Sequence, residues 1–441
     1  MYDICIIGAG IAGLYAAYNI KHLYPESNFI ILEKTDRIGG RIGNYSWYGT
    51  ELVIGAGIGR KKKDRLLYQL TKELKIKVNE FKVNPRHSEK LLSIGNFTEK
   101  TIKQYFKKTI KLLRDSYEEK HRGKTFKQYA KEILKSDYKK FILMAGYTDY
   151  ENEDAYETLY HYGLEDNTCC WTGFGFQWQE LIDRLVKFIG RERILLGCEI
   201  CKIDTDKANQ MNQTINGSVS NEMNQMEVNR ANKPINKKLN QTFILHSNNR
   251  EFHCKKVLLS GDSNTLLQLL NGLAPNLYKQ VKGQPFLRLY AKLSAKSGIL
   301  LREKIQGFTF VTGPLQRIIP MNKDAHVYMI AYNDNKNAVY LKSKLSSNQT
   351  NYIFYARLLE DTLSLPKDSL KIIALKAFYW DIGTHYYSPI SSESINRIDF
   401  IKQVQSPIKN LYVIGEMVSR NQGWSEGALE SVEKIIHNLY I

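Results

Sequence analysis

The sequence is poor in the features that mark secreted, membrane-spanning and disulfide-stabilised proteins. Its 441 residues include only six cysteines, without regular spacing, which predicts a reducing compartment rather than a disulfide framework. No run of about 20 apolar residues is present, so no membrane span is predicted. The apolar run 4–7 follows the first residues directly and leaves no room for a secretory leader. We therefore expect a cytoplasmic, intracellular protein.

Acidic residues are scarce relative to basic ones. The chain has 63 Lys and Arg against 45 Asp and Glu, a formal net charge of +18, which predicts attraction to anionic partners. The segment 101–140 holds 13 Lys and Arg against 5 Asp and Glu, or +8. Solvated helix faces explain this segment, and a surface for nucleic acid or an acidic protein is the alternative.

The N-terminal segment predicts a β-α-β unit. An apolar strand over 3–7 precedes a glycine-rich turn, a helical run over 10–24 that Pro25 stops, and a second strand over 29–32. Because consecutive strands joined by a helix run in the same direction, this unit implies a parallel sheet.

The remainder of the chain alternates between several kinds of segment. We expect mostly helices over 66–140, a further helix over 174–188 and a long alternating β region over 287–378. The segment 207–241 is rich in Asn and Gln and lacks aromatic residues, so it predicts a low-complexity surface loop. The end of the chain, over 411–439, returns to a strand, a turn and a helix.

The turn after the first strand carries a dinucleotide-binding pattern. Gly8, Gly10 and Gly13 have the spacing G-x-G-x-x-G, and Glu33 lies 20 residues beyond Gly13. Gly8 permits the tight turn, Gly10 lets a pyrophosphate approach the helix N-terminus, and Gly13 allows close packing of helix on strand. Glu33 would accept hydrogen bonds from a ribose diol. The residues predicted to bind cofactor here are Gly8, Gly10, Ile11, Ala12, Gly13 and Glu33.

Four further segments resemble the flavin-containing amine oxidase superfamily. They are the Gly-Gly-Arg segment 33–41, the segment 51–59 that passes the flavin ring, the last flavin strand 411–416 and the closing helix 423–431. The resemblance implies bound FAD. It adds, as cofactor-binding residues, Lys34, Gly39, Gly40, Arg41, Gly55, Ala56, Gly57, Gly415, Glu416, Trp424 and Ser425.

The same resemblance implies a small catalytic set. Members of the family have an aromatic pair over the flavin face, to which Trp424 and Tyr386 correspond, with Tyr387 as the next candidate. Many members also have a lysine that holds a water at flavin N5, which places Lys292 in this role. His385 stands near the position at which some relatives link covalently to flavin, but we expect a noncovalent cofactor.

The polar end of the substrate requires its own ligands. Arginine binds carboxylates through two parallel hydrogen bonds, and Arg60 and Arg317 are the candidates. Because the run 60–63 is entirely basic, we expect an acidic or zwitterionic substrate rather than a polyamine. No metal site is predicted, since Cys198 and Cys201 lie in a strand-like run and face opposite sides.

The predicted fold combines α/β and α+β parts. We expect a Rossmann-like FAD-binding domain with a parallel sheet over 1–65, 172–285 and 395–441, including the loop 207–241. We expect a discontinuous substrate-binding domain of antiparallel sheet and helices over 66–171 and 286–394.

The predicted function is oxidation of the C–N bond of an amine or amino acid, with hydride transfer to flavin N5 and dioxygen as acceptor, giving imine and hydrogen peroxide. Two alternatives remain open at this point. One is another flavin oxidoreductase on the same fold, such as a desaturase, and the other is a non-catalytic flavoprotein that binds nucleic acid or an acidic partner. The sequence does not predict an oligomeric state.

Overall fold

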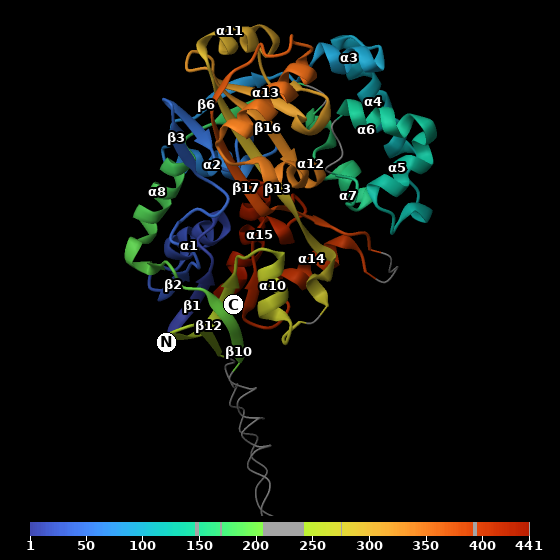
Figure 1. Ribbon diagram of the computed structural model, residues 1–441. Coiled ribbons are helices and arrows are strands. Elements are labelled where there is room, and N and C mark those ends of the chain that lie inside the picture. The colour runs from blue at the N-terminus through green and yellow to red at the C-terminus, as the bar shows by residue number, and fades with distance from the viewer. Residues whose placement is uncertain (146–149, 168–169, 206–241, 275, 391–394, 441) are drawn as a thin grey trace, which may run out of the picture.

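Two large β-sheets organise the part of the chain that the structure describes (Figure 1). The computed structural model describes residues 1–441 except 146–149, 168–169, 206–241, 275, 391–394 and 441. The low-complexity loop predicted over 207–241 therefore lies outside the described residues. Among the described helices, none combines the length and apolar character that a membrane crossing needs.

The first sheet has seven strands and contains the predicted β-α-β unit. Strands β1, β2, β9, β18 and the C-terminal half of β12 are parallel, whereas β10 and β11 are antiparallel additions at one edge. In spatial order the strands are β10 (Ile200–Thr205), β11 (Phe243–Ser247), β12 (Glu251–Leu259), β1 (Tyr2–Ile7), β2 (Phe29–Leu32) and β9 (Ile194–Leu195), and β18 (Leu411–Val413) pairs with β12.

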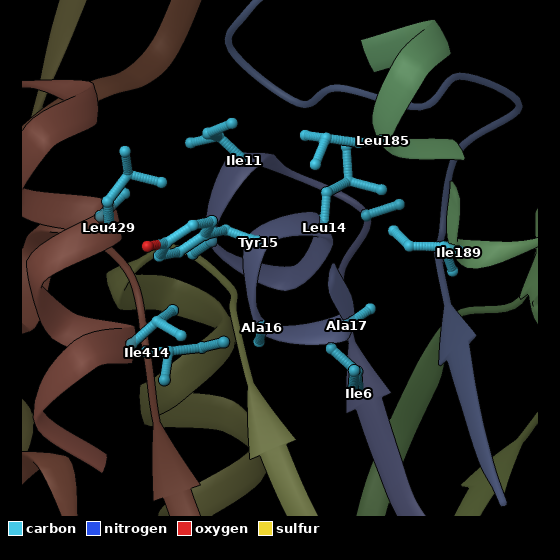
Figure 2. Packing of buried hydrophobic residues seen from close by; sticks show 14 of the residues in the cluster. Ile6, Ile11, Leu14, Tyr15, Ala16, Ala17, Leu185, Ile189, Ile414 and Leu429 are labelled. Atoms are coloured by element: carbon cyan, nitrogen blue, oxygen red, sulfur yellow. The ribbon is translucent and has the colours of Figure 1, made fainter. Parts of the chain in front are cut away.

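Both faces of this sheet are covered, as the unbroken apolar run of β1 predicts. Ile4 and Ile6 face a cluster formed with four helices, and Cys5 and Ile7 face the opposite cluster. Figure 2 shows Ile6 packed below the residues of α1. The helices on the first side are α1 (Ile11–Leu23), α2 (Arg65–Glu73), α8 (Trp178–Ile189) and α15 (Ser425–Ile436), and those on the second are α10 (Ser263–Leu270) and α14 (Arg397–Gln405).

The second sheet has six strands and is antiparallel except for its last pair. Its strands, in spatial order, are β17 (Ile372–Tyr387), β13 (Val281–Leu293), β16 (Val327–Asp334), β15 (Arg317–Asn322), β14 (Thr309–Phe310) and β7 (Arg86–His87). Three helices supply apolar residues to the core on this sheet: α11 (Ala295–Lys304), α12 (Asn335–Leu341) and α13 (Gln349–Leu363).

The prediction of a continuous β region over 287–378 is therefore wrong in part. Three helices interrupt it because their apolar residues recur at helical spacing, as Tyr355, Leu359 and Leu363 do in α13, where all three are buried. The strands that surround these helices do form the expected antiparallel sheet.

A separate helical core lies under the basic segment. It contains α3 (Glu89–Gly95), α4 (Glu99–Asp115), α5 (Phe126–Leu134), α6 (Tyr138–Ala145) and α7 (Ala155–Tyr160). Buried aromatic residues such as Phe106, Tyr129 and Phe141 fill it, whereas most lysines of α4 are exposed. The helices predicted over 66–140 are present, although the strands β6 (Asn79–Val83) and β7 lie among them.

Two small sheets complete the described elements. β3 (Asn44–Trp47) and β4 (Thr50–Val53) form a hairpin, and β8 (Trp171–Gly175) lies between β5 (Gly59–Arg60) and β6 (Asn79–Val83). The division into two domains stays a prediction. Its boundary between residues 285 and 286 falls inside β13, which joins the two parts.

Candidate cofactor and substrate site

The glycine-rich turn between β1 and α1 is sterically fixed. Gly8 has a φ of +101°, and a Cβ there would lie 2.2 Å from the carbonyl oxygen of Ser260. A Cβ on Gly13 would lie 2.0 Å from the carbonyl oxygen of Gly8, so helix and strand pack as closely as the motif predicts. A Cβ on Gly10 would meet nothing within 4 Å. Gly10 therefore keeps a cavity open rather than maintaining the packing.

Glu33, at the end of β2, is held by three donors. It is 8% exposed, and its Oε2 accepts a hydrogen bond of 2.8 Å from the backbone N–H of Ala9. Its Oε1 accepts from the backbone N–H and the hydroxyl of Thr35, at 3.0 and 2.8 Å. Because each carboxylate oxygen has two lone pairs, the fixed carboxylate can still accept from a ligand hydroxyl.

The Gly-Gly-Arg segment lies against the glycine-rich turn. Gly39 forms a β-bridge with Gly10, and a Cβ on Gly40 would lie 3.2 Å from the Gly10 Cα. Arg41 Nη1 donates to the carbonyl oxygen of Gly383 at 2.8 Å and to Glu416 Oε1 at 2.7 Å. The backbone of the segment and the fixed guanidinium thus border the same space as the turn.

Glu416 is the centre of a buried polar network. It is 5% exposed, and its Oε1 is also 2.5 Å from His385 Nδ1, while its Oε2 accepts from the backbone N–H of Gly423 at 2.9 Å. Burial raises the pKa of the carboxyl, but His385 and Arg41 lower it to about 2. The backbone N–H of Ser263 donates to His385 Nε2 at 3.1 Å, so the proton of this ring resides on Nδ1.

A cavity of about 480 Å³ brings the predicted cofactor residues together. It is lined by every one of them except Gly13, which packs helix on strand, and Gly57, which lines a second cavity. The helices α1 and α15 both begin at this cavity, and neither N-cap residue, Gly10 or Trp424, caps its helix through a side-chain hydrogen bond. Uncapped N-terminal amides carry partial positive charge and bind anions.

The sequence did not identify several residues that line this cavity. Asp262, Thr265 and Gln268 follow β12, and Cys198 and Ile200 lie between β9 and the first residue of β10. The signal that could have located the first group is the parallel pairing of β12 with β1, since the carboxyl ends of parallel strands meet at one edge.

The second cavity, of about 560 Å³, has a mixed wall to which eight aromatic residues contribute. The aromatic residues that line it are Phe81, Tyr150, Tyr162, Trp171, Phe176, Phe308, Tyr332 and Trp424. Trp424 is held in place by its Nε1, which donates to the buried Asp64 at 2.8 Å. Arg60 and Arg317, the predicted carboxylate ligands, also line this cavity.

Arg60 already has two carboxylate partners. Its Nη2 lies 2.7 Å from Asp64 and its Nη1 lies 2.9 Å from Asp166. Lys61 and Lys63 pair in the same way, with Glu80 and with Asp166, at 2.7 Å each. The basic run 60–63 is therefore largely neutralised by neighbouring acidic groups.

The predicted Lys292, Tyr386 and Tyr387 do not line either of the two cavities. The ammonium of Lys292 donates to the carbonyl oxygen of Ala325 instead. Tyr387 is fully buried, and its hydroxyl donates to the carbonyl oxygen of Ser419 at 3.0 Å. Tyr386 is half-buried, and burial raises its pKa.

Six residues line both cavities and so mark where the cavities meet. They are Arg288, Tyr332, Asp334, Thr384, Gly423 and Trp424. Of these, the sequence predicted only Trp424 as a site residue. In the described part of the chain, no cluster of His, Cys, Asp and Glu is arranged to hold a metal ion.

Comparison with known proteins supports the assignment of the fold. Residues 6–58 match the family model of the NAD(P)-binding Rossmann-like domain. No curated protein sequence matches significantly. Two solved structures are similar to 99% of this chain over 98% of their own length. Putrescine oxidase bound to putrescine matches with a TM-score of 0.69 and 12% sequence identity. Cyclohexylamine oxidase from Brevibacterium oxydans IH-35A matches with a TM-score of 0.69 and 14% sequence identity. The chain has the fold of the flavin amine oxidases, which confirms the predicted fold class.

Proposed function

We propose that this chain, which has the fold of the flavin amine oxidases, is an FAD-dependent oxidoreductase that oxidises the C–N bond of an amine or amino acid. The observation that carries the proposal is the junction of the two cavities. A cavity built from dinucleotide-binding segments meets an aromatic cavity at Trp424, Tyr332 and four further shared residues. Hydride transfer requires a substrate carbon in contact with a flavin ring. A substrate in the second cavity and a flavin in the first could meet at this junction.

The residues around the first cavity suit FAD. The glycine-rich turn, the Gly-Gly-Arg segment and the uncapped start of α1 would hold the diphosphate, and Glu33 would hold a ribose. Trp424 and Ser425, at the uncapped start of α15, also line the cavity, and the family resemblance implies that they would hold the flavin ring system there. When bound, FAD supplies a two-electron acceptor at its N5 and passes the electrons on to dioxygen, which yields hydrogen peroxide.

We further propose that the cofactor is held noncovalently. By the family resemblance, His385 stands near the position at which some relatives are linked to flavin. Both of its ring nitrogens have partners, Glu416 on one side and the amide of Ser263 on the other. A bond to flavin would require one of these contacts to break inside a buried network. Acid precipitation should therefore release all flavin colour from the protein pellet.

Substrate binding would use the aromatic wall of the second cavity. Trp424, fixed by Asp64, would lie beside the amine, because the π face of its ring attracts the approaching cation. The amine must give up its proton before the hydride is transferred. The carbon that carries the amine would lose the hydride, its nitrogen would form a C=N bond, and water would then hydrolyse the imine.

The charges on the cavity wall do not exclude cationic substrates. The acidic residues Glu51, Glu153, Asp166 and Asp334 outnumber the basic residues Arg60, Arg288 and Arg317. His161 adds no charge at neutral pH, because burial and the neighbouring Arg420 lower its pKa to about 4. The expectation that the run 60–63 repels polyamines thus loses its basis, and diamines belong in any substrate screen.

Anaerobic mixing tests the proposed function. The flavin-loaded protein is mixed with monoamines, diamines and amino acids, and at least one compound should bleach the oxidised flavin band. Admission of air should restore the band and release hydrogen peroxide. If no compound bleaches the flavin, the C–N oxidation fails and another flavin chemistry on this fold takes its place. Bleaching that air does not reverse would refute dioxygen as the acceptor.

A further inference from the structure

Arg288 on β13 is a buried cation at the junction of the two cavities. It is 6% exposed, and its guanidinium carbon lies 3.9 Å from the ring centre of Phe286 and 3.4 Å from that of Tyr332. The two rings cover the guanidinium, which leaves its N–H edge for hydrogen bonds. This edge belongs to a residue that lines both the cofactor cavity and the aromatic cavity.

The donors of Arg288 are largely unused. Within the described residues it makes one hydrogen bond, of 3.3 Å, from Nη1 to the carbonyl oxygen of Leu287, and no ion pair. A buried guanidinium has five N–H donors and is normally matched by a carboxylate or phosphate. An anionic group of a ligand at the junction would complete its shell.

Asp334 supplies an unused acceptor beside it. In the register of β13 and β16, Arg288 pairs with Tyr332 and Phe286 pairs with Asp334, so Arg288 and Asp334 are diagonal neighbours on one face of the sheet. Asp334 is the N-cap residue of α12, yet its carboxylate does not cap the helix, and among the described residues its buried Oδ1 has no hydrogen-bond donor. Burial raises the pKa of this carboxyl even though Arg288 and Arg317 oppose the shift, as expected for an anion that lacks direct donors.

A third polar atom at the junction is also unpartnered. The hydroxyl of Thr384 on β17 is buried, lines both cavities and makes no hydrogen bond within the described residues. The junction thus offers a cationic donor, an anionic acceptor and a hydroxyl around one point. The adjoining wall is aromatic.

We propose that this junction binds the head group of a zwitterionic α-amino acid, with its carboxylate on Arg288 and its amine facing Asp334. An α-amino acid carries both groups on the carbon that would be oxidised. A single ligand would therefore give Arg288 an anionic partner and Asp334 a cationic one. A simple amine would leave Arg288 without an anion and place a second cation beside it. The aromatic wall favours a large apolar side chain, as in phenylalanine. This inference rests on the proposed function, since it names the substrate class for the same site.

Phenylalanine and phenethylamine form a matched pair that differs only in the carboxylate. The rate constant of anaerobic flavin reduction, divided by the apparent dissociation constant, is measured for both enantiomers of phenylalanine and for the amine. The wild-type protein should prefer one enantiomer of phenylalanine over phenethylamine by about tenfold or more. Preference for phenethylamine would overturn the inference.

The variant R288Q should reverse this preference. Loss of a charged hydrogen-bonded pair should lower the ratio of reduction rate constant to dissociation constant for phenylalanine by about 100-fold. The same ratio for phenethylamine should stay unchanged or rise. R288K, which keeps the charge but not the planar fork, should recover part of the loss. D334N should weaken both substrates to a similar extent, because both carry the amine. The exposed Arg302 provides a matched control, R302Q, which should behave like the wild type.

Binding without turnover provides a readout independent of activity. α-Methylphenylalanine has no hydrogen on the reacting carbon, so its dissociation constant from the flavin-loaded protein can be titrated through the flavin spectrum. R288Q should weaken it by about 30-fold or more. The same substitution should leave unaffected the binding of 2-methyl-1-phenylpropan-2-amine, in which a methyl group replaces the carboxylate and the reacting carbon again has no hydrogen. If R288Q instead changes FAD affinity or the flavin reduction potential while the discrimination stays, the partner of Arg288 is the cofactor and the inference is wrong.

Failure of this inference is distinguishable from failure of the proposed function. If amines bleach the flavin but neither phenylalanine nor α-methylphenylalanine binds, the inference fails and the proposed function stands. If no compound bleaches the flavin, the proposed function fails, and carboxylate-dependent binding of α-methylphenylalanine through Arg288 would still support the site. Circular dichroism and flavin content verify that each variant is folded.

Discussion

Substitution of Glu416 by glutamine, E416Q, probes the buried network that joins the cofactor cavity to the second sheet. The carboxylate of Glu416 accepts from Arg41 and His385 through Oε1 and from the amide of Gly423 through Oε2. A glutamine of the same shape has only one accepting oxygen. Whichever way its amide turns, an NH2 group faces a donor, either the amide of Gly423 or the pair Arg41 and His385.

The magnitude follows from the pKa of the carboxyl. The network lowers it from 4.5 to about 2 despite burial, which opposes ionisation. Each unit of this difference in pKa corresponds to about 1.4 kcal/mol. The ionised network therefore contributes about 3 kcal/mol to the free energy of unfolding at neutral pH. Because the folded-state pKa is the lower one, this contribution is complete above pH 4.5 and is lost as the pH falls toward about 2.

Urea unfolding followed by tryptophan fluorescence, with FAD at a fixed saturating concentration, measures the effect. At pH 7, E416Q should unfold with a free energy about 3 kcal/mol below that of the wild type. The gap should narrow as the pH falls below 4.5. The control E303Q alters an exposed glutamate on α11 and should match the wild type throughout. A difference of less than about 0.5 kcal/mol at pH 7, or a gap that does not change with pH, would refute the reasoning.

Two further predictions follow from the site. G13A should destabilise the protein and prevent FAD retention, because the new Cβ would lie 2.0 Å from the carbonyl oxygen of Gly8. G10A should fold normally and weaken only FAD binding, because its Cβ would meet nothing within 4 Å. Thermal unfolding and the ratio of flavin to protein distinguish the two, and equal unfolding temperatures would contradict the packing argument. In K292M, substrate should reduce the flavin as fast as in the wild type in anaerobic stopped-flow experiments. The reason is that Lys292 donates to Ala325 and lines neither cavity. A tenfold slower reduction, on the order of a lost catalytic contact, would return Lys292 to the catalytic set.

The β-α-β unit could be predicted because its determinants are local. The strand Tyr2–Ile7, the helix Ile11–Leu23 and the strand Phe29–Leu32 differ from the predicted bounds by no more than one residue at each end. A helix begins where Gly10 opens the turn and ends before Pro25, and both signals lie in the sequence itself.

The residues that line the junction were less predictable because they depend on how strands align with the cavity. Arg288 and Lys292 lie on the same face of β13, and alternation alone cannot say which of them reaches the junction. In β17, Thr384 lines both cavities and His385 lines the second, whereas Tyr386 and Tyr387 line neither. Displacement by one or two residues along a strand moves a side chain to another face or another depth.

The ion pairs of the run 60–63 include one that the sequence could have predicted and one that it could not. The pairing of Arg60 with Asp64, four residues on, is local and could have been expected from the spacing. Its second partner, Asp166, lies 106 residues away in the chain, and only the fold brings the two together. The net charge of +18 therefore says little about the charge that a substrate meets.

By itself, the sequence determined the glycine-rich turn, its acidic partner Glu33 and the return of the chain's end to the same cavity, because short-range steric and hydrogen-bonding rules constrain each segment. Only the tertiary structure decided which charges face the substrate. It left Arg288 and Asp334 buried at the junction with no ion pair among the described residues. It also neutralised Arg60, because side chains distant in sequence meet only when the two sheets pack around one cavity.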